Sequence, residues 1–126
     1  MDKNIDELVK NFIDFYYTSI NNKNILPLQE LFKDYSKYNF EGNILSGANN
    51  ILNNINSQIL SDIHYKINTY DYLPCGDRRI NILINGEIKF KIDSVNYIIK
   101  HFNEYIHLAY GNDKKYWLPS IIIRSF

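Results

Sequence analysis

The sequence LFKDYSKYNFEGNILSG, residues 31–47, contains a change of period that separates a helical region from a region of strands. Apolar side chains recur at spacings of three and four from Pro27 onward, and proline is tolerated in the first turn of a helix because its missing N–H has no partner there. This spacing predicts a short helix over residues 27–35. Residues 38–45 then alternate around Gly42, which predicts a small hairpin.

Helical periodicity also holds on both sides of this stretch. Residues 4–20 carry one apolar stripe, as an amphipathic helix requires. Its members are Ile5, Leu8, Val9, Phe12, Ile13 and Tyr16. Asn4 followed three residues later by Glu7 is typical of an N-terminal cap with its reciprocal glutamate. After Gly47, residues 48–55 return to helical spacing and predict a third helix.

The second half of the chain has the period of β-strands. Residues 63–70 alternate, with Ile63, Tyr65, Ile67 and Thr69 expected on one face. Further strands are predicted over residues 79–92, 97–110 and 116–124. Asn85-Gly86 fits either a tight turn or a bulge. Pro119 implies a bulge or an edge position, because proline cannot donate to the ladder.

Helices that precede long strands predict an α+β domain in which three N-terminal helices pack on a curved antiparallel sheet. The chain of 126 residues suits one hydrophobic core, since folding at this length buries roughly two-thirds of the unfolded chain's surface. We therefore expect a single domain over residues 1–126.

Composition and charge argue against several classes of partner. The 14 basic residues equal the 14 acidic ones, so we expect neither nucleic acid nor an anionic membrane as partner. Cys75, the only cysteine, indicates a reducing compartment, hence the cytosol or nucleus. An acidic, polar N-terminus without a long apolar run predicts no signal peptide and no membrane anchor. The excess of isoleucine, asparagine and tyrosine is typical of an A/T-rich genome.

Residues 31–42 and 45–47 resemble the nuclear transport factor 2 family. In that family the second helix ends in an aromatic-x-Asp-x-Ser pattern, here residues 32–36, followed by aromatic-Glu-Gly, a second glycine and the third helix. Further matches are the Phe-x-x-x-Tyr-Tyr of residues 12–17, His64, Gly86–Lys89, Trp117 and Arg124. The resemblance covers nearly the whole chain and implies a cone-shaped domain.

The resemblance implies a non-enzymatic binding module of nucleocytoplasmic transport, located in cytoplasm and nucleus. Transport members are homodimers that bind the GDP form of the GTPase Ran and phenylalanine-glycine (FG) repeats of nuclear pore proteins. Phe40 and Glu41 match an aromatic and an acid of the Ran-binding rim. Asp93 matches the last of a second acidic cluster, whose first position is Lys91 here. Ile5 stands where the family has a tryptophan that helps to bind FG repeats.

The family also offers two alternative functions. One is a small enzyme of the ketosteroid isomerase or dehydratase type, whose cone encloses a tyrosine, a carboxylate or a histidine. The titratable groups that suit such a site are Tyr16, Tyr17, Asp34, His64, Asp71 and His107. No pair among them has a diagnostic spacing, so we expect no catalysis and no cofactor. The other alternative is a scaffold that binds short phenylalanine-containing peptides or a larger partner chain, as stress-granule and messenger-RNA-export relatives do.

Two further expectations concern metal binding and assembly. His101 and His107 lie six residues apart, hence ~20 Å apart on a strand, which forbids a shared metal. Apolar strand residues exceed what one small sheet must hide, and a sheet open on one face commonly buries it against a partner. These residues are Ile80, Ile82, Ile84, Ile98, Ile106 and Ile121–Ile123. They predict a homodimer.

Overall fold

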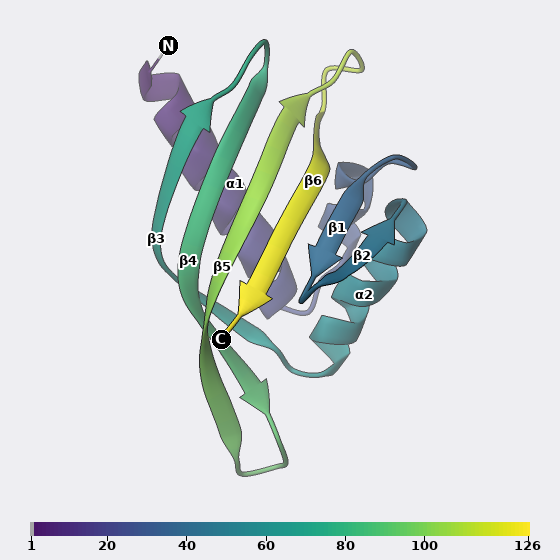
Figure 1. The fold of residues 1–126 in the computed structure, drawn as a ribbon, viewed down its shortest axis with the longest axis vertical. Coiled ribbons are helices and arrows are strands. Elements are labelled where there is room, and N and C mark those ends of the chain that lie inside the picture. The colour runs from purple at the N-terminus through teal and green to yellow at the C-terminus, as the bar shows by residue number, and fades with distance from the viewer. Residues whose placement is uncertain (1) are drawn as a thin grey trace.

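One curved six-stranded sheet, in the order β2-β1-β6-β5-β4-β3, is covered on one face by helices (Figure 1). The computed structural model describes residues 2–126, with side chains from residue 4 onward. The elements are α1 (Asp2–Asn21), the 3-10 helix η1 (Leu26–Leu31), β1 (Lys37–Phe40), β2 (Asn43–Ser46), α2 (Ala48–Leu60), β3 (His64–Pro74), β4 (Arg79–Lys91), β5 (Tyr97–Tyr110) and β6 (Tyr116–Ser125). The α+β class, the 38–45 hairpin and the long strands are confirmed.

The sheet is mixed, so the prediction of a wholly antiparallel sheet was wrong. β1 pairs with β6 in parallel, Phe40 opposite Ile123, whereas every other neighbouring pair is antiparallel. A parallel pair needs a long connection, and here α2 and four strands lie between β1 and β6 in the chain.

The predicted helix over residues 27–35 is only the single 3-10 segment η1, which ends at Leu31. Phe32 is already extended, with φ −113° and ψ 142°. The next residues form a turn, in which the buried Ser36 accepts a 2.9 Å hydrogen bond from the Lys33 N–H at its Oγ. This turn explains the Ser of the aromatic-x-Asp-x-Ser pattern, because its hydroxyl offers the backbone an alternative to further helix.

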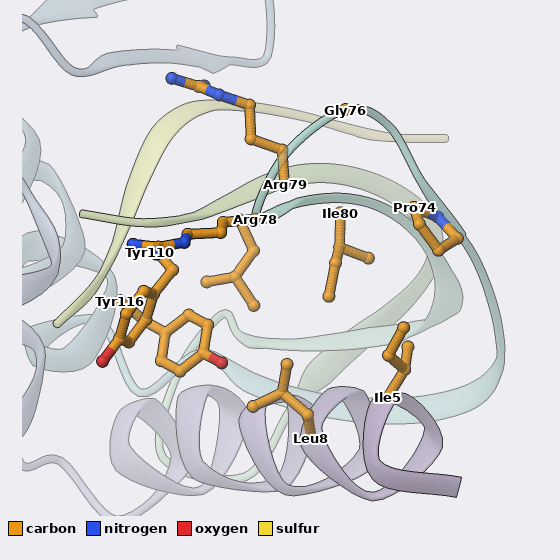
Figure 2. A pocket seen from close by; sticks show the side chains of 10 residues that line it. Ile5, Leu8, Pro74, Gly76, Arg78, Arg79, Ile80, Tyr110 and Tyr116 are labelled. Carbon is orange, nitrogen blue, oxygen red and sulfur yellow. The ribbon is translucent and has the colours of Figure 1, made fainter. Parts of the chain in front are cut away.

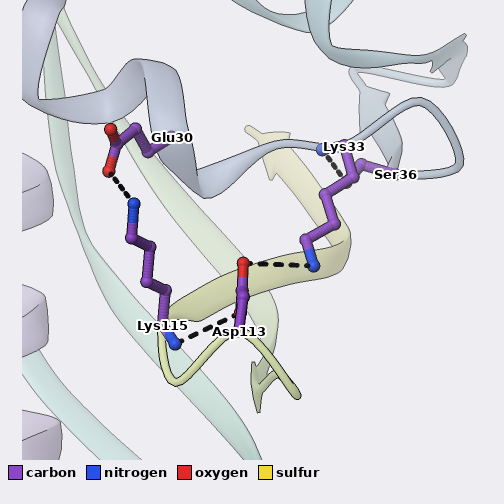
Figure 3. Close-up of polar contacts among 5 residues, drawn as sticks. All are labelled: Glu30, Lys33, Ser36, Asp113 and Lys115. Carbon is purple, nitrogen blue, oxygen red and sulfur yellow. Dashed lines mark hydrogen bonds and ion pairs between the residues drawn. The ribbon is translucent and has the colours of Figure 1, made fainter.

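Ion pairs hold the β5–β6 turn against η1 and the turn that follows it (Figure 3). Lys115 Nζ lies 3.3 Å from Glu30 Oε2, and Lys33 Nζ lies 3.8 Å from Asp113 Oδ2. The Lys33 ammonium also stands 4.8 Å from the ring centroid of the buried Trp117. Segments about 80 residues apart in the chain are thereby joined.

A β-bulge in β3 changes which of its residues face the core. The register with β4 shifts between Ile67 and Thr69, so Tyr70 becomes half-buried and Thr69 is exposed, contrary to the alternation predicted for residues 63–70. β4 runs straight through Asn85-Gly86, without the turn or the bulge considered for that pair. A Cβ atom at Gly86 would lie 2.0 Å from the Lys66 carbonyl oxygen, so the bulged strand approaches β4 where only glycine fits.

The bulge implied by Pro119 is present in β6. His107 pairs with Ser120 and Ala109 pairs with Trp117, so β6 spans this interval with one more residue than β5. The parallel pairing of β6 with β1 begins at Ser120, opposite Lys37, so Pro119 lies outside that ladder.

The core lies between the helices and the inner face of the sheet. Six of the eight isoleucines that predicted a homodimer are buried there: Ile80, Ile82, Ile84, Ile106, Ile121 and Ile123. Only Ile98 and Ile122 remain exposed, at 46% and 49%. The number of apolar strand residues is therefore no evidence for a partner, because the chain's own helices cover most of them. No helix within residues 2–126 combines the length and apolar character of a membrane span.

Candidate functional site

A cavity of about 430 Å³ opens between the N-terminal half of α1 and the end of the sheet where the β3–β4 and β5–β6 loops meet (Figure 2). Ile5 and Leu8 point from α1 toward Ile80 on β4 (Figure 2). The other lining residues are Pro74, Gly76, Arg78, Arg79, Leu108, Tyr110 and Tyr116. The cavity thus has an apolar floor and a rim of tyrosines and arginines.

The two arginines at the rim have different roles. The Arg78 guanidinium lies 5.6 Å from the centroid of the Tyr110 ring, a cation–π distance, and its backbone is left-handed with φ 57°. Arg79 turns away from the cavity (Figure 2) and donates to His107 Nε2 at 3.1 Å on the outer face of the sheet. Arg78 is therefore the arginine whose guanidinium stays at the rim of the cavity.

Of the predicted partner-binding residues, only Ile5 lines this cavity. Phe40 and Glu41 lie at the β1–β2 turn, and Asp93 lies in the β4–β5 turn at the far end of the sheet (Figure 1). The structure does not bring Ile5 together with the other three.

Glu41 and Asp93, the two acids predicted for a Ran-binding rim, each accept hydrogen bonds from within the chain. Glu41 Oε1 accepts a 2.6 Å hydrogen bond from the Ser125 N–H, in a residue with a left-handed φ of 53°. Asp93 accepts hydrogen bonds from the Val95 and Asn96 N–H groups at 2.9 and 2.8 Å, and from the Asn96 amide at 3.0 Å. The Asn96 side chain, then these backbone donors, lower the pKa of Asp93. Each acid therefore stabilises a turn.

Lys91 and Phe40, which neighbour these acids in the predicted Ran-binding rim, also contact other side chains of this chain. Lys91 Nζ lies 3.3 Å from Asp62 Oδ2, and a second cation, Lys23, pairs with the same carboxylate. Phe40 is half-buried with its ring centroid 6.0 Å from that of Tyr38. These four side chains therefore already have partners within the chain.

A cluster of polar side chains lies inside the core. Tyr17 donates from its hydroxyl to Glu104 Oε1 at 2.5 Å, and Glu104 is only 1% exposed. Burial raises the pKa of Glu104 to about 7, against the opposing effects of the hydroxyls of Tyr17 and Tyr16. The Tyr16 hydroxyl has no hydrogen-bond partner among the described residues. Glu104 is thus a buried carboxyl with no cation beside it in the part of the chain that the structure describes.

Gln58 of α2 joins two further buried tyrosines beside this pair. Its amide nitrogen donates to the Tyr38 hydroxyl at 3.0 Å, and its amide oxygen accepts from the Tyr65 hydroxyl at 2.5 Å. Burial, followed by the nearby carboxylate Glu104, raises the pKa of Tyr38 well above its usual value. These hydroxyls are therefore neutral donors and acceptors that position one another.

Comparison with known protein families identifies the family of this chain. The family model described as the nuclear transport factor 2 (NTF2) domain matches residues 8–125. This chain belongs to the NTF2 domain family. No curated protein matches this NTF2 domain by sequence.

Solved structures share the fold of this NTF2 domain at low sequence identity. Nuclear transport factor 2 from Cryptosporidium parvum superposes with a TM-score of 0.82 and 19% identity, over 96% of this chain and 94% of that chain. A chain of the yeast complex of deubiquitinase Ubp3 with its cofactor Bre5 gives 0.78 and 14%, over 97% of both chains. A protein from Streptomyces avermitilis, assigned as a dehydratase of the NTF2-like family, gives 0.81 and 12%, over 99% and 97%. At such identities these likenesses show the fold alone.

The NTF2 domain brings together only two of the residues considered for catalysis. Tyr16 and Tyr17 meet Glu104, whereas Asp34, His64 and Asp71 are exposed. Glu104 was missed. Its signal in the sequence is a carboxylate at an inward position of an alternating strand, between Phe102 and Ile106.

His107 belongs to a separate cluster on the outer face. Arg79 donates to its Nε2, so Nδ1 carries the hydrogen that is donated to Asn81 Oδ1 at 2.7 Å. Desolvation, then the Arg79 charge, lowers the pKa of His107. Cys75 Sγ lies 3.9 Å from the same Nδ1, which in this tautomer cannot accept the thiol proton. Within residues 2–126 no group of three or more acidic, histidine or cysteine side chains is arranged to hold a metal ion.

Proposed function

We propose that this NTF2 domain is a non-enzymatic protein-binding module that holds an apolar side chain of a partner peptide in the cavity between α1 and the β3–β4 loop. One observation carries the proposal: among the residues whose side chains the structure describes, the cavity of about 430 Å³ is lined by aliphatic side chains, tyrosines and arginines, without a carboxylate or histidine. A catalytic site needs convergent acid–base groups, whereas an anchor pocket needs apolar walls and a polar rim.

The preferred ligand is a short peptide that contains phenylalanine, of the FG-repeat kind, in a transport role in cytosol and nucleus. Ile5, at the position matched to the family's FG-binding tryptophan, supports this choice because it lines the cavity beside Leu8. Arg78 at the rim favours a peptide with an acidic residue near its phenylalanine.

Binding of a Ran-type GTPase receives less support. Glu41 and Asp93, the acids that would pair with a basic partner, already accept hydrogen bonds within the chain, Glu41 from Ser125 of β6 and Asp93 from its own turn. Lys91 adds a cation at a position where the transport members carry an acid. The enzymatic alternative is also weaker, because Glu104 and Tyr17 are buried in the core and do not line the cavity.

We further propose that two copies associate through the outer face of the sheet. Leu83 on β4 is 54% exposed and Ile122 on β6 is 49% exposed, on the face that no helix covers. Between Leu83, Leu73 and the half-buried Tyr105, a hollow of about 290 Å³ offers complementary space for apolar side chains of a second copy. Large exposed apolar patches commonly mark sites of protein–protein contact.

The peptide-binding proposal is tested by isothermal titration with a synthetic peptide containing two Phe-Gly pairs and flanking aspartates. Leu8→Asp introduces a charge into the cavity floor, so we expect affinity to fall at least about tenfold. Leu60→Asp is the matched control, because Leu60 is 78% exposed at the end of α2 and outside the cavity. The same peptide with serine for phenylalanine should not bind. Equal affinity of wild type and Leu8→Asp, with both folded, would reject the cavity as the docking site.

A further inference from the structure

The half of β5 nearest the β4–β5 turn has an uncovered edge. Pairing with β6 begins at Phe102 opposite Ser125, and His101 exchanges both backbone hydrogen bonds with Phe126, at 3.1 and 2.9 Å. β4 covers the other side of residues 97–100. No strand in the described part of the chain pairs with Tyr97–Lys100 on the β6 side. Figure 1 shows this β4–β5 ribbon extending beyond the C-terminus.

The backbone groups on this edge point outward in a regular row. In an antiparallel ladder, alternate residues direct their N–H and C=O groups to opposite sides of the strand. His101 directs both groups toward Phe126, so Ile99 and Tyr97 direct theirs to the same, open side. Such a row is a template for an added strand.

Three of the four side chains of Tyr97–Lys100 are apolar or aromatic, and they lie on both faces of the sheet. Tyr97 and Ile99 are each 53% exposed on the outer face, and Ile98 is 46% exposed on the inner face. Edges that avoid pairing usually carry charges, proline or a bulge. Here apolar side chains on both faces are available to contact alternate side chains of an extended peptide.

The charges around this edge are mostly basic. Lys89 Nζ stands 4.0 Å from the centroid of the Tyr97 ring, and Lys100 Nζ stands 5.9 Å from that of Phe90. Two acids on the ribbon and the neighbouring turn, Asp93 and Glu41, accept hydrogen bonds within the chain. The remaining acid on this part of the ribbon is Glu87, opposite His101. A second copy added here would bring identical lysines together, whereas an acidic chain is attracted.

We propose that the free edge of β5, Tyr97–Lys100, binds an acidic peptide segment in extended conformation as an added strand. Its acidic residues lie on the inner face, on the side of Lys100, and its intervening β-branched residues contact Tyr97 and Ile99 on the outer face. This surface is separate from the cavity at the other end of the sheet, so it does not depend on the function proposed for that cavity.

The test uses an end-blocked eight-residue peptide of alternating valine and glutamate, and the same peptide with lysine for glutamate. Amide hydrogen exchange should slow at Tyr97 and Ile99 when the glutamate peptide is added. Ile99→Pro removes one outward N–H, and proline is tolerated at such edge positions, while Ile99→Ala keeps the N–H. We expect the proline variant to bind about fivefold more weakly than the alanine variant. The lysine peptide should bind wild type at least about fivefold more weakly than the glutamate peptide.

Amide spectra of both variants establish that each remains folded. Equal binding by the two variants, protection confined to other residues, or no binding of the glutamate peptide would each overturn the proposal. Protection of Tyr97 and Ile99 by raising the protein concentration alone would assign this edge to a second copy and would also overturn it.

Discussion

Replacing Glu104 by glutamine should remove a pH dependence of folding that this one carboxyl causes. Glu104 faces Tyr16 and Tyr17 in the core, with Ile84 and Ile123 beside it on neighbouring strands and no cation in contact among the described side chains. Glutamine keeps an oxygen that accepts the Tyr17 hydrogen bond. Its amide also supplies a donor near the Tyr16 hydroxyl, which lacks a partner among the described residues.

The sign and size of the effect follow from the pKa of Glu104. Burial raises it from 4.5 to about 7, so the native state holds a proton that the unfolded chain releases between these values. The stability that Glu104 contributes to the native state is therefore fully present below pH ~4.5 and is lost as the pH rises through ~7. Since a tenfold change in proton affinity is worth ~1.4 kcal/mol, the loss is about 3 kcal/mol. That is a large part of the ~5–15 kcal/mol typical of a domain.

Urea unfolding at pH 4.5 and pH 8 measures this loss. The free energy of unfolding of wild type minus that of Glu104→Gln should fall by about 3 kcal/mol between the two pH values, because other titrating groups cancel in the difference. Glu87→Gln, on the outer face, is the control and should show no such change. A difference independent of pH would refute the reasoning, and a rise with pH would show that Glu104 is ionised and stabilised in the native state.

Three other substitutions test the fold and the assembly. Gly86→Ala should destabilise the domain by at least about 3 kcal/mol in urea unfolding, since its Cβ would lie 2.0 Å from the Lys66 carbonyl oxygen. Gln58→Leu leaves two buried tyrosine hydroxyls unpaired and should cost about 2–4 kcal/mol; adding Tyr65→Phe should restore part of it. Leu83→Lys should halve the mass measured by light scattering if copies pair through the outer face, whereas Leu26→Lys, on η1, should not.

Elements with long, uninterrupted periods were predictable, whereas elements shaped by distant contacts were not. β5 was predicted with its observed ends, Tyr97 and Tyr110, because alternation and the following turn residues agree. The helix predicted to reach Tyr35 ends earlier, and Tyr35 instead packs edge-on against Trp117, 5.1 Å away between ring centroids. The bulge in β3 is opposite Gly86 of the next strand, a relation that the sequence of β3 alone does not contain.

The candidate sites show the same division. The resemblance located Ile5, and the cavity contains it, but the loops that complete the cavity come from residues about 70 and 105 positions later. Glu41 and Asp93 match acids of the family's binding rim, yet Glu41 accepts a hydrogen bond from Ser125, 84 residues away, and Asp93 accepts its hydrogen bonds within a turn whose geometry the match does not specify. Glu104 was detectable as a carboxylate in the apolar phase of β5, but its partner Tyr17 lies 87 residues away.

The two proposed docking surfaces are joined by one strand, which sets what a single partner chain must look like to occupy both. Tyr110 lines the cavity and Tyr97 begins the free edge, at opposite ends of β5. A strand rises ~3.3 Å per residue, so the surfaces lie roughly 40 Å apart. A partner with a phenylalanine motif and an acidic segment therefore needs at least about 13 linking residues to bind both. Linking them that way should raise the affinity ~100-fold or more over either segment alone, whereas a five-residue linker should give no gain. Equal affinities with the two linkers would show that the surfaces do not act together.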